Sequence, residues 1–291
     1  MQDKTGLKPA MWPEDFFNMK PRFLLTAILL LLTCGAWAND FDHHSWDELL
    51  RGHVVMTDNP AVTTVDYSAL LTEEPQLDAY LAALSAVTPT EFGSWSAESQ
   101  LAFLINAYNA WTIKLMLSAY PGIQSIKDLG SLFSTPWEKR FIKLLGSTRS
   151  LDDIEHNLIR GSAQLRDPRI HFAVNCASIG CPALRPEAYT AASLDTQLED
   201  QTRRFLADRQ RNRLRGSTLA ISPLFKWYRE DFERDWRNID SLNQFLISYA
   251  PELGLDKTNI RQLQAGRISI EYTDYDWRLN DSNPPVTLRD Q

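Results

Sequence analysis

Apolar and polar residues alternate over residues 170–175, where the sequence reads IHFAVN. A period of two predicts a half-buried strand, with one face in the core and His171 and Asn175 on the other face. Turn-forming residues over 177–182 end this strand, so Cys176 is expected at its carboxyl end, where it opens a tight loop. Loops held by a rigid scaffold often carry functional residues, which makes this loop the first candidate for a site.

Apolar residues at helical spacing predict most of the remaining elements. The expected helices cover residues 47–55, 74–87, 96–120, 151–159, 193–206 and 241–249. Shorter strands are expected at residues 137–145, 219–222 and 268–275. Because internal repeats and long linkers are missing from the sequence, residues 39–291 are expected to form a single α+β domain.

The helix predicted over residues 96–120 is apolar nearly all round, yet it contains two amides. Ser96 is placed to cap its start. Asn106 and Asn109 are three residues apart and therefore share one side of the helix. A buried amide without partners is costly, so these two either satisfy the backbone of a nearby loop or line a polar cavity as binding groups, together with Asn175.

Residues 1–38 have the pattern of a leader and not of a fold. A basic stretch after Met19, an apolar run over residues 23–33 and the sequence Ala36-Trp37-Ala38 predict a signal peptide that is cleaved after Ala38. We interpret residues 1–18 as an extension upstream of the true start. The apolar run is short for a membrane span, so we expect no stable span after cleavage, and a periplasmic or secreted protein. Cys34 is a weaker, alternative lipidation site.

Charge excludes one class of partner. The net charge of the chain is -7, and it becomes -8 when the leader, with its four basic and three acidic residues, is removed. A protein that binds nucleic acid needs a basic face, and the sequence shows none. The sequence also lacks a phosphate-cradling glycine-rich loop, so no cofactor is expected. A small molecule, a peptide or an envelope protein remains as a possible partner.

Two cysteines, Cys176 and Cys181, remain after leader cleavage, and they allow three interpretations. In an oxidising compartment they would form a disulfide across a small loop. Alternatively, Cys176 is a catalytic nucleophile. A zinc site would need a second matching pair of ligands, so no metal is predicted, and the C-x4-C spacing differs from the C-x-x-C of thioredoxin-like enzymes.

A catalytic thiol would need an imidazole and a carboxylate. A strand rises roughly 3.3 Å per residue, so His171 would lie about 16 Å from Cys176 and on the opposite face. His156 is therefore the first choice as the base. Asp152 precedes it by four residues on the predicted helix and is placed to orient it, although an exposed row of ion pairs is the other interpretation of this spacing.

Five segments together resemble the bacterial and plant family known as domain of unknown function 547. In this chain they read FLINAYNAWTIKLML, LDDIEHNLIR, IHFAVNCASIGCP, FKWYREDF and YDWRLN. The resemblance implies an α+β fold, with helices packed on a small, mostly antiparallel sheet. It also implies a distant similarity to the papain and transglutaminase group of thiol hydrolases.

In that group the nucleophile begins a helix, and a His and an acid follow on strands. The comparable helix here offers Asn106 and Asn109 in place of Cys, the comparable His is His171 and the comparable acid is Asp276. We therefore expect an exported protein with a degenerate hydrolase-like cleft, which serves as a binding or scaffold protein of the cell envelope. The alternative is a periplasmic cysteine hydrolase that acts on peptide or amide bonds, with Cys176 as nucleophile.

Overall fold

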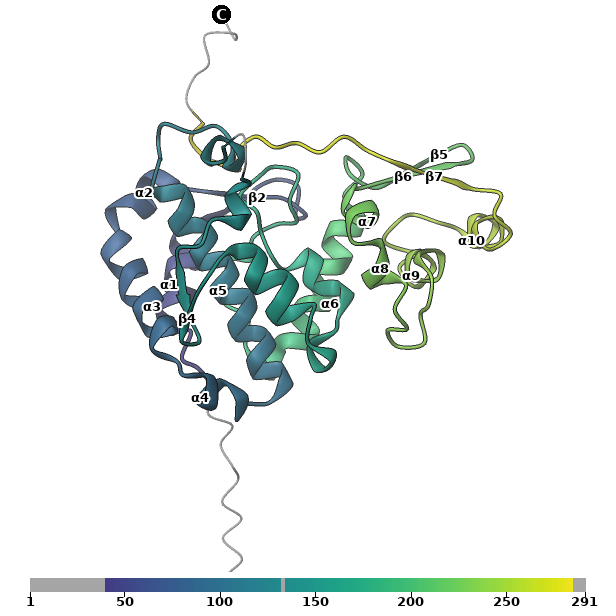
Figure 1. Cartoon of the computed structure of the whole chain (residues 1–291). Helices are drawn as coiled ribbons and strands as arrows, with labels where there is room; N and C mark the ends of the chain where they lie inside the picture. The colour runs from purple at the N-terminus through teal and green to yellow at the C-terminus, as the bar shows by residue number, and fades with distance from the viewer. Residues whose placement is uncertain (1–39, 132–133, 285–291) are drawn as a thin grey trace, which may run out of the picture. The chain divides into compact units, whose positions relative to one another are not determined.

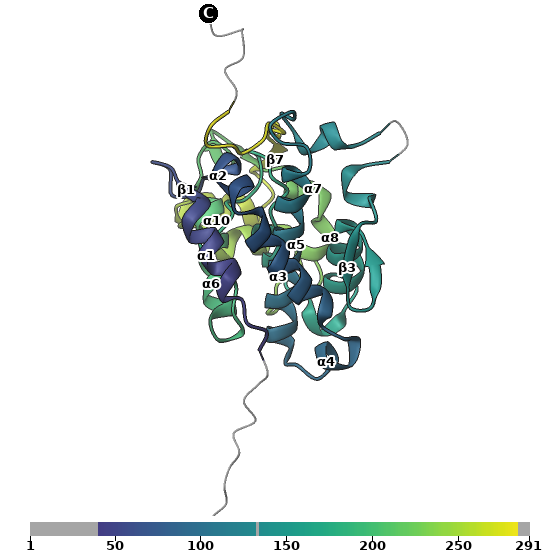
Figure 2. The same cartoon turned by 90° about the vertical axis from the view of Figure 1, so that its left-hand side faces the viewer.

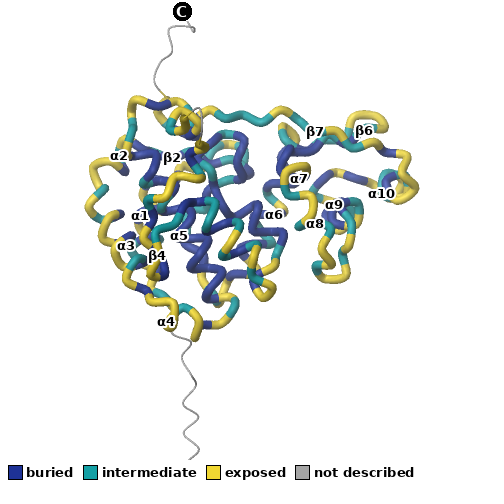
Figure 3. Tube along the Cα trace, in the orientation of Figure 1, coloured by how far each residue is buried: buried dark blue, intermediate teal, exposed yellow. Residues whose placement is uncertain are grey.

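The longest helix in the described residues, α5 (Ala97–Leu117), lies at the centre of the larger hydrophobic core (Figure 1). The computed structural model describes residues 40–131 and 134–284, so the predicted leader lies outside the described residues. Seventeen of the 21 residues of α5 are buried, and Figure 3 shows the helix as a buried rod among more exposed neighbours. Ser96 caps it through a hydrogen bond from the Ser99 N–H, as predicted.

Helices cover α5 from several sides. Figures 1 and 2 show α1 (His44–His53) and α3 (Glu74–Ala86) on one side, and α5 also packs against η3 (Asp153–Ile159) and η6 (Ala191–Ser193). The elements that precede or follow α5 in this part of the chain are α1 (His44–His53), α2 (Tyr67–Thr72), α3 (Glu74–Ala86), α4 (Pro89–Gly93), η1 (Ile126–Leu129), η2 (Pro136–Glu138), η3 (Asp153–Ile159), η4 (Ala163–Leu165), η5 (Pro168–Phe172) and η6 (Ala191–Ser193). η3 is a π-helix, and the others named η are 3-10 helices.

A second hydrophobic core lies between α6 and the elements that follow it. These elements are α6 (Leu194–Ala207), β5 (Arg213–Arg215), β6 (Thr218–Ile221), α7 (Leu224–Trp227), α8 (Arg229–Phe232), α9 (Leu242–Ser248), α10 (Lys257–Gln264) and β7 (Ser269–Tyr272). Phe172 of η5 belongs to this core, whereas Ile170 and Ala173 beside it belong to the core around α5. The segment around residue 171 therefore lies between the two cores.

The strands confirm the α+β class, but they form three small sheets in the described residues where one was expected. β1 (Val54–Met56) pairs with β2 (Thr63–Val65), and β3 (Ile142–Leu144) pairs with β4 (Ser147–Arg149), both antiparallel. In the third sheet β6 is the central strand, antiparallel to β5 and parallel to β7. No helix in the described part of the chain is long and apolar enough to cross a membrane.

The strand predicted over residues 170–175 is wrong, because this segment begins as the 3-10 helix η5. Pro168 occupies the first turn of η5, and the Asp167 side chain accepts a hydrogen bond from the Arg169 N–H. Proline at this position and a capping Asp both favour a helical start. Local capping thus outweighs the alternating pattern, and His171 and Cys176 are not separated by the length of an extended strand.

Side-chain amides bind the backbone groups that a strand would have paired. The Asn109 side chain donates to the Ala173 carbonyl at 3.0 Å and accepts from the Asn175 N–H at 2.8 Å. Gln201 of α6 donates to the Phe172 carbonyl at 3.2 Å. Because buried backbone groups need partners, these amides take the place of a neighbouring strand.

Replacing Asn109 by alanine (Asn109→Ala) should destabilise the fold, because the Ala173 carbonyl and the Asn175 N–H then lack partners. Each unsatisfied buried group costs about 1–3 kcal/mol, so we expect the free energy of unfolding to fall by roughly 2–5 kcal/mol. Urea unfolding followed by circular dichroism measures the change. Asn157→Ala removes an exposed amide and should change stability by less than about 0.5 kcal/mol. Equal stability of the two variants would contradict the role of Asn109.

Candidate ligand pocket with a disulfide in its wall

A cavity of about 280 Å³ brings together side chains from α5, η3, α7, the loop after η5 and the segment after β7. Its lining residues are Tyr108, Thr135, Trp137, Asp152, Glu155, His171, Val174, Cys176, Cys181, Pro182, Leu224, Trp227, Tyr228, Tyr275 and Trp277. We call this cavity the aromatic pocket. Its volume is close to the lower end of the range typical of small-molecule sites.

Aromatic rings form much of the wall of the pocket. The Tyr275 and Trp277 rings lie 4.4 Å apart between centroids, and Trp227 lies 4.9 Å from Tyr275 and 5.8 Å from Trp277. Trp137 contacts Trp277 edge to face at 5.7 Å. Trp227 is 46% exposed although it is a large apolar residue. Exposed rings beside a cavity are available to stack on a ligand.

His171 is buried beside this aromatic wall. Its ring stacks on Tyr228 at 3.8 Å, and its Nε2 lies 2.7 Å from Oδ2 of Asp231. Its Nδ1 lies 3.8 Å from Oε1 of Glu155, which is too long for a hydrogen bond. Both of these atoms are buried without a hydrogen-bond partner in the structure.

Asp231 determines which nitrogen of His171 carries the proton. Burial alone would raise the pKa of Asp231, but hydrogen bonds from His171 and from Arg160, at 2.5 Å, outweigh it and hold the pKa well below its usual range. An ionised carboxylate only accepts hydrogen bonds, so the His171 Nε2–H is the donor. When His171 is neutral, its Nδ1 is then a free acceptor beside the pocket.

Glu155 contributes the second acid near His171. It lies on the π-helix η3 and is 3% exposed. Burial, the charge of Glu155 and a hydrogen bond to Glu155 raise the pKa of Tyr228, so Tyr228 keeps its proton. Nearby, burial raises the pKa of Asp152 although His156 acts in the opposite direction.

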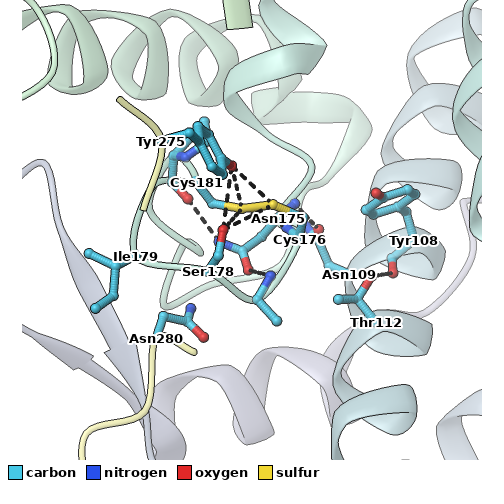
Figure 4. Close-up of a disulfide and its surroundings, with 12 residues drawn as sticks. Tyr108, Asn109, Thr112, Asn175, Cys176, Ser178, Ile179, Cys181, Tyr275 and Asn280 are labelled. Carbon is cyan, nitrogen blue, oxygen red and sulfur yellow. Dashed lines mark hydrogen bonds between the residues drawn. A yellow bond between two sulfur atoms is a disulfide. The ribbon is translucent and has the colours of Figure 1, made fainter. Parts of the chain in front are cut away.

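Cys176 and Cys181 are joined by a disulfide that forms part of the pocket wall. Figure 4 shows Tyr275 lying across this bond, with Ser178 below it. The Tyr275 hydroxyl is 3.1 Å from the Cys176 sulfur and 3.3 Å from the Cys181 sulfur. Burial raises the pKa of Tyr275 to about 12, so the hydroxyl remains a donor at neutral pH.

Close backbone packing places Tyr275 over the disulfide. The Gly180 N–H donates to the Asp276 carbonyl at 2.8 Å, and the Ile179 N–H donates to the Arg278 carbonyl at 2.9 Å. A Cβ atom on Gly180 would lie 2.9 Å from the Tyr275 ring and from the Asp276 nitrogen. Only glycine fits this contact without a shift.

Residues 92–206 match a family model described as "Protein of unknown function, DUF547". This segment belongs to the DUF547 family. No curated protein and no solved structure matches the chain, so the distant similarity to the papain and transglutaminase group stays a prediction.

The DUF547 segment holds only part of the aromatic pocket. It includes Tyr108, Glu155, His171 and the disulfide. Asp231 and the aromatic wall from α7 and residues 275–277 lie outside the matched range. The FKWYREDF and YDWRLN segments are therefore needed to complete the site, although the family model does not cover them.

The structure does not bring Asp276 to either of the candidate histidines. Its carboxylate pairs with Arg278 at 2.6 Å, and it does not line the pocket. Asp231 is the carboxylate that contacts His171. The FKWYREDF motif pointed to the segment that contains Asp231, but a pattern of apolar residues gives no signal for which acid turns inward.

His156 lies beside Asp152 as the four-residue spacing predicts, with 3.7 Å between Nε2 and Oδ1. Its Nδ1 is 2.7 Å from Nη1 of Arg160, and its side chain is 39% exposed. Asp152 lines the aromatic pocket, but His156 does not. The imidazole in the aromatic pocket is that of His171.

The three predicted binding amides hold the backbone and do not line the pocket. Asn106 exchanges two hydrogen bonds with the backbone of Tyr189, at 2.8 and 3.0 Å. Asn109 binds the loop after η5 as described above. Asn175 donates to the Pro182 carbonyl and accepts from the Ala177 N–H, both at 2.8 Å. These contacts correspond to the backbone role that the sequence left open for Asn106 and Asn109.

Other polar clusters are less suited to binding. In the part of the chain that the structure describes, no group of three or more His, Cys, Asp or Glu could hold a metal ion. Another cavity, of about 320 Å³, has Asp231 and several arginines in its lining. Arg160 and Arg234 share Asp231 there, and Arg237 pairs with Asp195, so acids neutralise part of this positive charge.

Because Cys176 and Cys181 form a disulfide, neither of them should react with iodoacetamide in the folded, unreduced protein. After reduction under unfolding conditions, both Cys176 and Cys181 should take the label, because a disulfide sulfur has no thiolate and a reduced one does. Peptide mass spectrometry of the two samples measures the difference. Labelling of Cys176 before reduction would contradict the disulfide.

Asp231 also makes stability depend on pH. Its folded pKa lies below the unfolded value of about 3.9, so its contribution is present above that pH and is lost as the pH falls further. Asp231→Asn leaves Arg160 without its counter-charge and should lower the free energy of unfolding by on the order of 3 kcal/mol near neutral pH.

Urea unfolding of wild type and Asp231→Asn, near neutral pH and again at about pH 3, measures this effect. The stability difference between them should narrow in acid. Glu230→Gln, at a neighbouring acid whose side chain is 79% exposed, is the control and should have little effect at either pH. A difference that stays constant with pH would show that the charge of Asp231 is not responsible.

Proposed function

We propose that this chain is an exported binding protein of the cell envelope, which takes a small ligand into the aromatic pocket. The observation that carries the proposal is the pocket itself, a cavity of about 280 Å³ with exposed Trp227 beside it and buried His171 and Glu155 in its wall. Apolar and aromatic walls with a few polar groups are typical of ligand sites.

The lining favours a ligand with a flat or apolar face and without a negative charge. Trp137 and Trp227 offer ring faces on which a planar group stacks, whereas the Lys127 ammonium already lies 3.7 Å from the centre of the Trp277 ring. None of the described lining residues is Lys or Arg, whereas Asp152 and Glu155 are acids. An anionic group would meet like charge there, and a cation over an aromatic face would be attracted.

Two features support export of the protein. The leader pattern of residues 19–38 is that of a signal peptide, and disulfides such as Cys176–Cys181 persist mainly in oxidising compartments. Location in the cell envelope is part of the proposal.

A second candidate function is that of a cysteine hydrolase acting on peptide or amide bonds. The observation that favours it is the contact of His171 with Asp231, which leaves Nδ1 of His171 as a potential base beside the pocket that Cys176 also lines. This function requires Cys176 to be reduced, because a disulfide sulfur is not a nucleophile. The binding function does not require reduction of Cys176, and for this reason we place it first.

Ligand-observed NMR with a panel of small fragments tests the binding function. Benzamide and benzylamine should bind more tightly than benzoate, because the ionisable groups of the lining include two acids and no Lys or Arg. Trp227→Ala should weaken binding about tenfold, since a stacked aromatic contact contributes on the order of 1 kcal/mol beyond the area that it buries.

Trp236→Ala is the matched control, because Trp236 is partly exposed but lies outside the aromatic pocket. It should bind the fragments as wild type does. If no fragment binds, or if both tryptophan variants lose binding equally, the aromatic pocket is not the ligand site.

A further inference from the structure

Hydrogen-bond donors converge on the two sulfurs of the disulfide. The Cys176 N–H donates to the Cys181 sulfur at 2.9 Å. The Ser178 hydroxyl lies 3.4 Å from each sulfur, and the Tyr275 hydroxyl also contacts both (Figure 4). A disulfide sulfur carries no hydrogen, so only the hydroxyls can donate to it, and each hydroxyl has one proton to donate. The Ser178 hydroxyl also donates to the Tyr275 hydroxyl at 3.5 Å, which leaves the Tyr275 proton for the sulfurs.

These donors matter more for a thiolate than for a disulfide. A sulfur in a disulfide is a weak acceptor, whereas hydrogen bonds to a charged acceptor are about twice as strong. The Cys181 sulfur accepts from a backbone N–H and is contacted by both hydroxyls. The site would therefore stabilise Cys181 as a thiolate when the bond to Cys176 breaks.

The two cysteines also differ in exposure. Cys181 is 3% exposed, whereas Cys176 is only partly buried, and both line the aromatic pocket. An attacking group that enters the pocket meets Cys176 as the more exposed cysteine. Exchange is fastest when the accessible sulfur is attacked and the other leaves as a stabilised thiolate.

We propose that Cys176–Cys181 is a reactive disulfide, which captures a thiol-bearing ligand in the aromatic pocket. The ligand binds as the neutral thiol and loses its proton to water, and the thiolate then attacks the Cys176 sulfur. The bond between Cys176 and Cys181 breaks, and Cys181 leaves as the thiolate with the electron pair. The product is a mixed disulfide between the ligand and Cys176. Attack of the Cys181 thiolate on Cys176 in the reverse direction releases the ligand thiolate and restores the original bond.

This inference rests on the proposed function, because the thiol reaches Cys176 through the same pocket. The pocket also implies a preference among thiols, since its walls favour a flat apolar group without negative charge. A thiol attached to an aromatic ring system through a short linker has both properties. Benzyl mercaptan is therefore a suitable probe, and 2-mercaptoethanol is its aliphatic counterpart.

The experiment follows mixed-disulfide formation by mass spectrometry after the oxidised, full-length protein is mixed with each probe and quenched in acid. We expect the probe on Cys176 and a free thiol on Cys181. Exchange should be faster in the folded protein than in the same protein unfolded in urea, because only the fold supplies the donors. Benzyl mercaptan should react faster than 2-mercaptoethanol in the folded protein alone.

Tyr275→Phe removes one donor and should slow exchange about tenfold, since a poorer leaving thiolate departs more slowly. Tyr249→Phe is the matched control, because its hydroxyl binds Glu199 and does not contact the disulfide. It should exchange as wild type does. Comparable rates for the two variants, a probe attached to Cys181, or slower exchange in the folded than in the unfolded protein would each overturn the proposal.

The outcomes separate this inference from the proposed function. If fragments bind but the disulfide does not react with 2-mercaptoethanol, the binding function is supported and the exchange reaction is contradicted. Rapid exchange with 2-mercaptoethanol at Cys176, without preference for benzyl mercaptan and without fragment binding, would support the reactive disulfide and contradict the ligand pocket.

Discussion

The site depends on two hydrogen bonds by which the Asn109 side chain fixes the backbone after η5. One amide on the buried helix α5 donates to Ala173 and accepts from Asn175, and so fixes both ends of a short stretch of backbone. His171 lies just before that stretch and Cys176 just after it. A buried amide can bind a donor and an acceptor at once, so a single residue sets the position of both the imidazole and the disulfide. Asn106 holds the backbone of Tyr189 in the same way, three residues earlier on α5.

Buried charge imposes the second constraint, since a charge inside a protein needs a partner of opposite sign. Asp231 of α8 lies between His171 and Arg160, and its short contacts to both connect α8 to the core around α5. Glu155 is buried beside the same histidine, with its Oε1 3.8 Å from Nδ1 of His171. Such a set is weak support for stability, but it restricts how α8 docks, because separating Asp231 from Arg160 would leave each charge without this partner.

The helices could be predicted from the sequence wherever an apolar pattern was long or a cap was present. The predicted residues 96–120 contain α5, and residues 74–87 and 193–206 correspond closely to α3 and α6. The conformation of residues 170–175 could not be predicted correctly from the alternating pattern. Its apolar residues do not share one face, because Ile170 packs in one hydrophobic core and Phe172 in the other. Its hydrogen-bond partners are side chains of α5 and α6, and a pattern along a single segment contains no information about partners from elsewhere in the chain.

The same limit applies to the site. Cys176, Cys181 and His171 stand out in the sequence because their residue types are rare, whereas Asp231 and Tyr275 are ordinary residues in their own segments. Tyr275 reaches the disulfide because Gly180 has no Cβ, which lets residues 275–278 pack on the disulfide loop. This packing places the Tyr275 hydroxyl in contact with both sulfurs. A substitution at Gly180 would therefore act on the disulfide without touching either cysteine, because the Tyr275 ring and the Asp276 backbone occupy the space that a side chain would need. The chemistry of the loop depends on a backbone contact between segments almost a hundred residues apart.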